Sequence, residues 1–160
     1  MPIAAPLLDV TLLRQVGVPD PLPVLDQAEV CMGRSEQPSV NERRPRQIRR
    51  IVMAWLSFWD LRQHVDEAGL LLSELVTNAF RHGQGNVQVR MFLTQAYLAF
   101  EVRSGSTGAA AVRHADECDE SGRGLWLVEE FSDRWGVSSD NAGVWCTLPI
   151  PRPGLGDADR

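Results

Sequence analysis

The stretch from Leu70 to Gly83 reads LLLSELVTNAFRHG, and it predicts a long amphipathic helix with an unusual polar face. Glu74, Asn78 and His82 recur four residues apart, which stacks them one turn above another on an α-helix. Apolar residues fill the core-facing positions: Leu71, Leu72, Leu75, Val76 and Ala79. Asn is a poor helix former, and an interior carboxylate is unfavourable without a partner. The row is therefore either a line of ligands or the wet side of an ordinary surface helix.

The composition indicates one globular domain. Hydrophobic residues make up 44% of the 160 residues and charged residues 23%, and the net charge is −5. A negative chain is a poor general binder of nucleic acid, so we expect no direct contact with it. The three cysteines form no disulfide or metal-binding pattern, and no run is typical of a signal peptide or membrane span. We therefore expect a cytoplasmic protein that binds no membrane.

Five prolines interrupt the start of the chain, so residues 1–27 are predicted to form a Pro-rich arm. One short amphipathic helix within this arm would dock on the body, pair with a second subunit or stay loose. The domain itself is expected to span residues 28–150, followed by a polar tail at residues 151–160.

Hydrophobic periodicity predicts the elements of the domain. Short apolar or alternating runs indicate strands at residues 28–32, 86–93, 97–102, 135–137 and 144–148. Helices are expected from Pro45 to Trp59, through the opening stretch, and after Gly124, with a loop from Pro38 to Asn41. Gly83 should end the central helix as a C′ glycine. This order predicts an α/β (α+β) two-layer sandwich, in which a mixed, mostly antiparallel sheet carries helices on one face.

Arginines gather at the start of the first long helix, at positions 43, 44, 46, 49 and 50. Cations at a helix N-terminus are mildly unfavourable, which leaves room for an acidic partner. The run has two further meanings, a nucleic-acid patch or a solvated face, and the solvated face is the commonest.

A second group of residues points to phosphate. Residues 104–121 show no periodicity, and a long irregular loop inside a compact domain is usually functional or mobile. Gly122-Arg123-Gly124 ends this loop and a helix follows, so glycines and first-turn N–H groups can approach an anion. An Asn oxygen can bind the Mg²⁺ that bridges phosphates, and a carboxylate one turn earlier can orient a hydroxyl group for phosphoryl transfer. The two groups together predict a nucleotide site.

The same two stretches resemble a known family. ELVTNAFRHG resembles the N-box of the GHKL superfamily, the ATPases related to histidine-kinase catalytic domains and gyrase, and SGRGLWLVEEFSDRWGV resembles its second glycine box. The particular form is similar to the anti-sigma factor serine kinases of Gram-positive bacteria, especially the short actinobacterial ones. The resemblance covers roughly residues 28–150 and implies a Bergerat-type ATP-binding fold with ATP and Mg²⁺ as cofactors.

The resemblance also implies roles for single residues. Glu74 would be the catalytic base and Asn78 the Mg²⁺ ligand, with Arg81 and His82 near the phosphates or the lid. Phosphate contacts would come from the second glycine box: Gly122, Arg123, Gly124 and Leu125. Such a protein serine/threonine kinase acts as a homodimer, holds a sigma factor and phosphorylates a STAS-type anti-anti-sigma protein.

Two positions depart from the family pattern. Ser104 stands where an Asp normally accepts a hydrogen bond from the adenine amino group, and Gly143 stands where a Thr normally supports that contact. Losing such a charge-assisted bond costs on the order of 1.5–3 kcal/mol, roughly tenfold to a hundredfold in affinity. A water held by Ser104 would still read adenine. The alternative to a kinase is therefore a degenerate, nucleotide-independent module that sequesters a regulatory protein.

Overall fold

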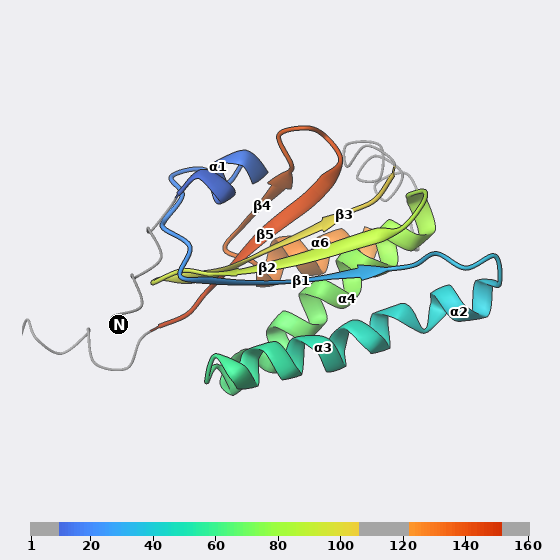
Figure 1. The fold of residues 1–160 in the computed structure, drawn as a ribbon, viewed down its shortest axis with the longest axis horizontal. Coiled ribbons are helices and arrows are strands. Elements are labelled where there is room, and N and C mark those ends of the chain that lie inside the picture. The colour runs from blue at the N-terminus through green and yellow to red at the C-terminus, as the bar shows by residue number, and fades with distance from the viewer. Residues whose placement is uncertain (1–9, 106–121, 152–160) are drawn as a thin grey trace, which may run out of the picture.

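The computed structural model describes residues 10–105 and 122–151 (Figure 1). Its elements in chain order are α1 Thr11–Val16, β1 Asp26–Met32, α2 Pro38–Glu42, α3 Arg44–Phe58, the 3₁₀ turn η1 Arg62–His64, α4 Val65–His82, β2 Val87–Leu93, β3 Tyr97–Arg103, α6 Gly122–Phe131, β4 Arg134–Val137 and β5 Gly143–Pro149. Within the described ranges, no helix combines the length and the apolar character needed to cross a bilayer. Most of the predicted loop at 104–121, from residue 106 onward, lies outside the described residues.

The strands form one five-stranded sheet in the order β1-β2-β3-β5-β4, with α3, α4 and α6 on one face (Figure 1). The predicted two-layer α/β sandwich is confirmed. The prediction of a mixed sheet was wrong, because all four strand pairings are antiparallel. The chain returns through turns at β2–β3 and β4–β5, and β5 enters beside β3 in the opposite direction, so no parallel pair arises among the strands of residues 10–105 and 122–151.

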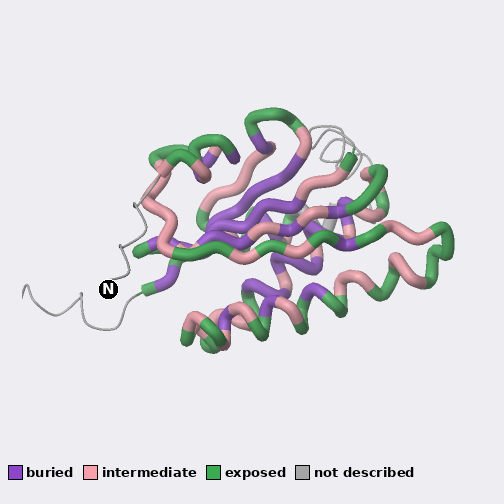
Figure 2. The backbone as a smooth tube through the Cα atoms, in the orientation of Figure 1, coloured by how far each residue is buried: buried purple, intermediate pink, exposed green. Residues whose placement is uncertain are grey.

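The main core lies between the sheet and its three helices. Helix α3 buries Ile48, Val52 and Leu56, and α4 buries a continuous apolar stripe against the strands. Strand residues alternate between faces, so one set from each strand joins this core. Cys146 belongs to that set, and burial raises the pKa of its thiol, which therefore behaves as a small apolar side chain. Figure 2 shows the central strands buried along most of their length, whereas α3 is exposed on its outer side.

A second core lies on the opposite face of the sheet, beneath α1. Leu13, Val16 and Val18 pack there against Tyr97 and Trp145. The Leu22 N–H donates to the Tyr97 hydroxyl at 3.0 Å. Of the three arrangements considered for the helix in the arm, the structure has the docked one. Helices therefore cover both faces of the sheet, and the prediction of helices on one face holds only for α3, α4 and α6.

Two local predictions were wrong for identifiable reasons. The region from Pro38 to Asn41, predicted as a loop, is mostly the short helix α2, because Pro38 occupies its first turn, where no N–H is needed. Gly83 ends α4 in an extended conformation with φ −94°, so it is not a left-handed C′ glycine. Its lack of a side chain is needed for packing instead: a Cβ there would lie 2.4 Å from the Ser104 Oγ.

Candidate functional site

Helix α4 is the middle helix of the layer, with α3 on one flank and α6 on the other (Figure 1). The Arg49 Nε on α3 donates to the Ser73 Oγ at 2.7 Å, which fixes the flank that faces α3. Phe80 also lies on that flank, since it lines a hollow together with residues of α2 and α3. Asn78 and His82 are each two residues from Phe80, which places them on the other side of the helix, toward α6.

The row predicted from the sequence is not the wet side of a surface helix. Asn78 is only 8% exposed, and Glu74 and His82 are half-buried. Within the described ranges the Asn78 side chain makes no hydrogen bond. Buried amide groups in proteins are normally hydrogen-bonded. A nearly buried residue whose amide makes no hydrogen bond within the described ranges, on the flank that faces α6, is the kind of group that a ligand would satisfy.

The C-terminal end of α4 is held by an arginine that sequence reasoning missed. Arg34 donates from Nη1 to the Phe80 carbonyl at 2.8 Å, from Nη2 to the Ala79 carbonyl at 3.1 Å, and from Nε to the Gly85 carbonyl at 2.9 Å. Its guanidinium also lies 5.2 Å from the centre of the Phe80 ring. The bond to Phe80 satisfies a carbonyl of the last turn, and the bond to Ala79 adds a second donor to a carbonyl that already accepts from the Gly83 N–H at 2.9 Å. No sequence signal marks Arg34, because its partners are backbone atoms 45 to 51 residues away.

Three segments meet at this end of α4. The Gly105 N–H donates to the Gln84 carbonyl at 2.5 Å, and the Ser104 N–H donates to the Ala142 carbonyl at 3.2 Å. The Ser104 side chain lies against Gly83. The end of β3 is thus joined both to the end of α4 and to the turn that precedes β5. Ser104, the position of the expected adenine-binding Asp, lies at this junction.

Backbone bonds also fix the direction of α6. The chain that leaves α6 reaches Asp133, whose N–H donates to the Thr147 carbonyl at 2.8 Å, and β4 begins opposite Thr147. Strand β5 starts four residues earlier, at Gly143, which pairs with Arg103 at the end of β3. Helix α6 therefore begins toward the end of the sheet where β3 stops and runs to the opposite end (Figure 1). Its first turn and the last turns of α4 lie at the same end of the sheet.

The predicted site residues fall on these elements as follows. Glu74, Asn78, Arg81 and His82 are on α4, and Ser104 follows β3. Gly122, Arg123, Gly124 and Leu125 form the first turn of α6, whose side chains lie outside the description. In the described ranges, no group of three or more His, Cys, Asp or Glu side chains is placed to hold a metal ion.

The electrostatics of this end favour an anion. The first turn of a helix carries a partial positive charge and unpaired N–H groups, and α6 presents that turn here. Arg81, in the last turn of α4, adds an exposed positive charge. Acidic side chains of α4 lie mostly in its first turn, at Asp66 and Glu67. Glu74 is the exception, one turn before Asn78.

Gly143 does not point toward this site. A Cβ at Gly143 would lie 2.9 Å from the Arg103 Cγ and 2.9 Å from the Ser138 Oγ. Arg103 alternates with Val102, which faces the helix layer, so Arg103 is on the opposite face of the sheet. A threonine at 143 would therefore clash on the α1 side rather than support a nucleotide contact beneath the helices.

That opposite face carries a buried carboxylate, also missed from the sequence. Glu101 is fully buried and accepts hydrogen bonds from the Arg90 Nε at 2.9 Å and from the Ser138 Oγ at 2.7 Å. Arg103 lies beside it and pairs with Asp140 in the β4–β5 turn. The bond to Arg103 lowers the pKa of Asp140 and raises the pKa of Arg103. The network ties the β4–β5 turn to β3.

Comparison with known proteins agrees with this geometry. A family model described as the histidine kinase-like ATPase domain matches residues 39–149, which include α4, α6 and all the sheet except β1. No curated protein gives a match. Because the family model covers more than half of the sequence, the chain belongs to the histidine kinase-like ATPase domain family.

Proposed function

We propose that the chain binds Mg²⁺-ATP where the last turns of α4 approach the first turn of α6. The observation that carries this proposal is Asn78, a nearly buried residue on the α6 side of α4 whose amide makes no hydrogen bond within the described residues. Membership of the histidine kinase-like ATPase family supports it independently. The phosphates would lie against the N–H groups of the α6 turn that begins at Gly122.

The chemistry of this donor set fits a magnesium ion held mainly by phosphate. Mg²⁺ keeps several waters and takes one or two oxygen ligands from the protein, and Asn78 offers one such oxygen. When bound, the ion neutralises charge on the phosphates. Glu74, one turn before Asn78, would accept the proton of an attacking hydroxyl group. Arg81 would supply positive charge at the same end of α4, and His82 would lie near the phosphates.

The finer part of the proposal is a role as an anti-sigma factor kinase. The chain would hold a sigma factor, phosphorylate a STAS-type anti-anti-sigma protein on serine, and act as a homodimer. The motif forms ELVTNAFRHG and SGRGLWLVEEFSDRWGV support this subtype. Family membership alone does not distinguish this subtype, because the family includes ATPases with other partners.

A second candidate function is a nucleotide-independent module that sequesters a regulatory partner. Ser104 favours it, since this residue replaces the adenine-binding Asp and lies against the end of α4. Helix C-termini carry partial negative charge, so an Asp at this position would be less favourable unless a ligand bonded to it. A serine at this position avoids that unfavourable charge and removes the acceptor for the adenine amino group.

Calorimetric titration with ATP and Mg²⁺ separates the two functions. A kinase gives saturable heat at micromolar nucleotide, and no heat at high micromolar nucleotide would contradict it. Ser104→Asp is the matched variant. If the natural chain is a nucleotide-independent module, this variant should bind nucleotide and the natural chain should not. Equal affinity in both chains would exclude the module. Position 143 is left unchanged, because its Cβ would clash with Arg103 and Ser138.

Phosphoryl transfer is tested with Glu74→Gln, which keeps the shape of the side chain and removes the base. This variant should bind nucleotide as tightly as the natural chain and lose turnover by at least about a hundredfold. Turnover is followed as ADP release in the presence of candidate STAS-type proteins. Unchanged turnover would remove Glu74 from the proposed mechanism.

A further inference from the structure

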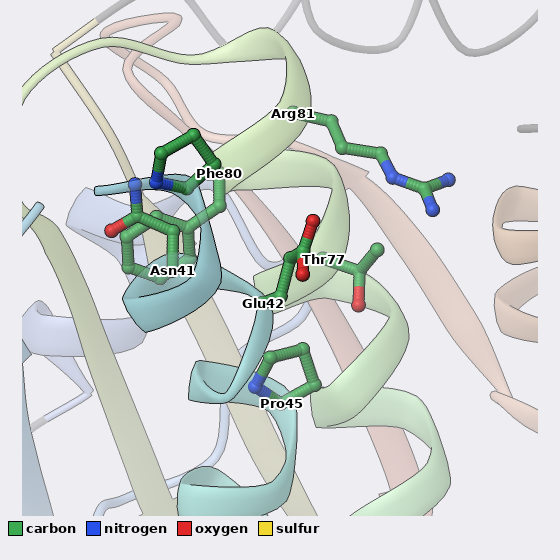
Figure 3. A pocket seen from close by; sticks show the side chains of 7 residues that line it. Asn41, Glu42, Pro45, Thr77, Phe80 and Arg81 are labelled. Atoms are coloured by element: carbon green, nitrogen blue, oxygen red, sulfur yellow. The ribbon is translucent and has the colours of Figure 1, made fainter. Parts of the chain in front are cut away.

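The outer surface of the α3–α4 pair contains hollows on the flank of α4 that faces away from α6. The first has a volume of about 480 Å³ and is lined by α2, the start of α3 and the end of α4. Figure 3 shows the Glu42 carboxylate directed toward Thr77 across this hollow, and the Arg81 side chain extending away from it. The second, of about 360 Å³, lies further along the same groove, between the middle of α3 and the start of α4.

The crest of α3 beside this groove is strongly basic. Arg43, Arg46 and Arg50 are exposed at a spacing of three and four residues, so they lie along one side of the helix. Arg49 lies in the groove itself, where it lines the second hollow. Among residues 10–105 and 122–151, no carboxylate lies within 4.0 Å of any of these four guanidinium groups.

These arginines do little for the helix they occupy. Arg44, in the same run, bonds to Gln47 and to the Gly33 carbonyl and so has a structural role. The side chains of Arg43, Arg46 and Arg50 make no hydrogen bond within the described ranges, and the first two oppose the helix dipole. The acidic groups that face the groove are Glu42 at one end and Asp66 at the other. The groove therefore stays positive in a chain whose net charge is −5.

The second hollow supplies an apolar contact next to the arginines. It is lined by Met53, which is 53% exposed, and by Val65 and Leu70. Gly69 in its floor has no side chain to fill it. An exposed Met in a groove is an adaptable contact for an apolar side chain. Met53 lies three residues, slightly less than one helical turn, beyond Arg50, so charge and apolar contact are adjacent on α3.

We propose that the groove between α3 and α4 binds an acidic amphipathic helix of a partner protein. One apolar side chain of that helix enters the hollow lined by Met53, Val65 and Leu70, and flanking carboxylates pair with Arg46, Arg49 and Arg50. The combination of an apolar hollow with basic flanks matches helix-in-groove recognition. Nucleic acid would use the arginines but not the hollow, and the net charge opposes it. This surface is separate from the proposed nucleotide site and does not depend on it.

The test uses the full chain and a fluorescein-labelled amphipathic peptide of ~16 residues, with leucines at helical spacing and glutamates beside them. Fluorescence anisotropy should give saturable binding that weakens as NaCl rises from about 50 to about 500 mM. Arg46→Glu and Arg50→Glu should each raise the Kd about tenfold. Met53→Gln should raise it about threefold to tenfold through loss of the apolar contact. The control is Arg14→Glu, an exposed arginine on α1 with the same change of charge, which should leave the Kd unchanged.

Three results would overturn the proposal. The first is absence of binding at high micromolar peptide. The second is equal binding of a peptide in which every glutamate is replaced by glutamine, or equal loss in Arg14→Glu. The third is tighter binding of a duplex DNA of ~20 base pairs that depends on Arg46 and Arg50 but not on Met53. Circular dichroism of each variant separates loss of binding from loss of fold, and calorimetry with ATP reads the nucleotide site independently.

Discussion

Asn78 is the residue at which stability and function should separate most clearly. Its buried amide has no hydrogen-bond partner in the described ranges, and Asn is a poorer helix former than Ala. Asn78→Ala should therefore leave the free energy of unfolding unchanged or raise it by about 0.5 kcal/mol. The same change should weaken Mg²⁺-nucleotide binding at least about tenfold, because the proposed Mg²⁺ ligand is lost. Urea denaturation and calorimetry measure the two effects on one sample.

Thr77→Ala is the matched control for that substitution. Thr77 is the preceding residue, is half-buried, and donates its hydroxyl to the Ser73 carbonyl within the helix. It faces the α3 flank, so its loss should leave nucleotide affinity unchanged. A large loss of stability in Asn78→Ala would mean that Asn78 is a structural residue.

Glu101 contrasts with Asn78, because its substitution should affect stability and not nucleotide binding. Removing a buried charge leaves its partners unsatisfied, so Glu101→Ala should lower the free energy of unfolding by about 3 kcal/mol. Arg90 and Arg103 are partly exposed, so water can solvate their guanidinium groups when Glu101 is removed. The loss of stability should therefore be near the lower end of the range for broken buried ion pairs. Glu29→Ala on the exposed strand β1 is the control and should change stability by less than about 0.5 kcal/mol. Equal effects of the two changes in urea denaturation would contradict this role.

At the scale of elements, the Arg34 contacts make a specific prediction about the end of α4. Arg34→Ala removes bonds to three carbonyls, so the last turn of α4 should open more easily, by about 1–3 kcal/mol. Hydrogen exchange should then speed up at amides of residues 80–85 and stay unchanged in the first half of the helix. The control is Arg44→Ala, in which an arginine at the start of α3 loses its bond to the Gly33 carbonyl. Uniform acceleration along α4 would show that Arg34 stabilises the whole fold and not this end.

The elements differ in how far the sequence determines them. The strands and the two long helices were predicted within a few residues, since their apolar periodicity is long enough to be unambiguous. Helix α2 was missed because its five residues bury no side chain and so carry no periodic signal. The conformation of Gly83 was predicted wrongly because a glycine after a helix is usually left-handed. Here glycine is required because a larger side chain would clash with Ser104. That contact joins segments about twenty residues apart and cannot be seen locally.

At the scale of the whole molecule, α1 is part of the fold. Deleting residues 1–19 would expose Tyr97 and Trp145 on the sheet and remove the burial of Leu13, Val16 and Val18. We expect the free energy of unfolding to fall by about 3–6 kcal/mol, and the truncated chain to self-associate through the bare face. Light scattering and thermal denaturation measure the two effects. A truncated monomer of unchanged stability would mean that α1 docks without contributing to the fold.

The candidate site was only partly predictable. The motifs around Asn78 and Gly122 indicate which residues would carry the proposed chemistry, because those residue types suit Mg²⁺ and phosphate. Their placement at one end of the sheet depends on the β4–β5 hairpin, whose pairing with β3 sets the direction of α6. The orientation of Gly143 away from the helix layer follows from the same pairing. Strand register of this kind is a tertiary property and leaves no local pattern.

Amide chemical shifts recorded during titration with Mg²⁺-ATP test the nucleotide site most directly. We predict that the largest changes fall on Asn78, His82, Ser104 and the first turn of α6 from Gly122, and that Asn78→Ala shifts the midpoint of these changes to at least about tenfold higher nucleotide. Amides of the α3–α4 groove, such as Met53, should not move. Saturating nucleotide that leaves those amides unchanged, or that shifts only residues outside α4, α6 and the end of β3, would contradict the proposed site.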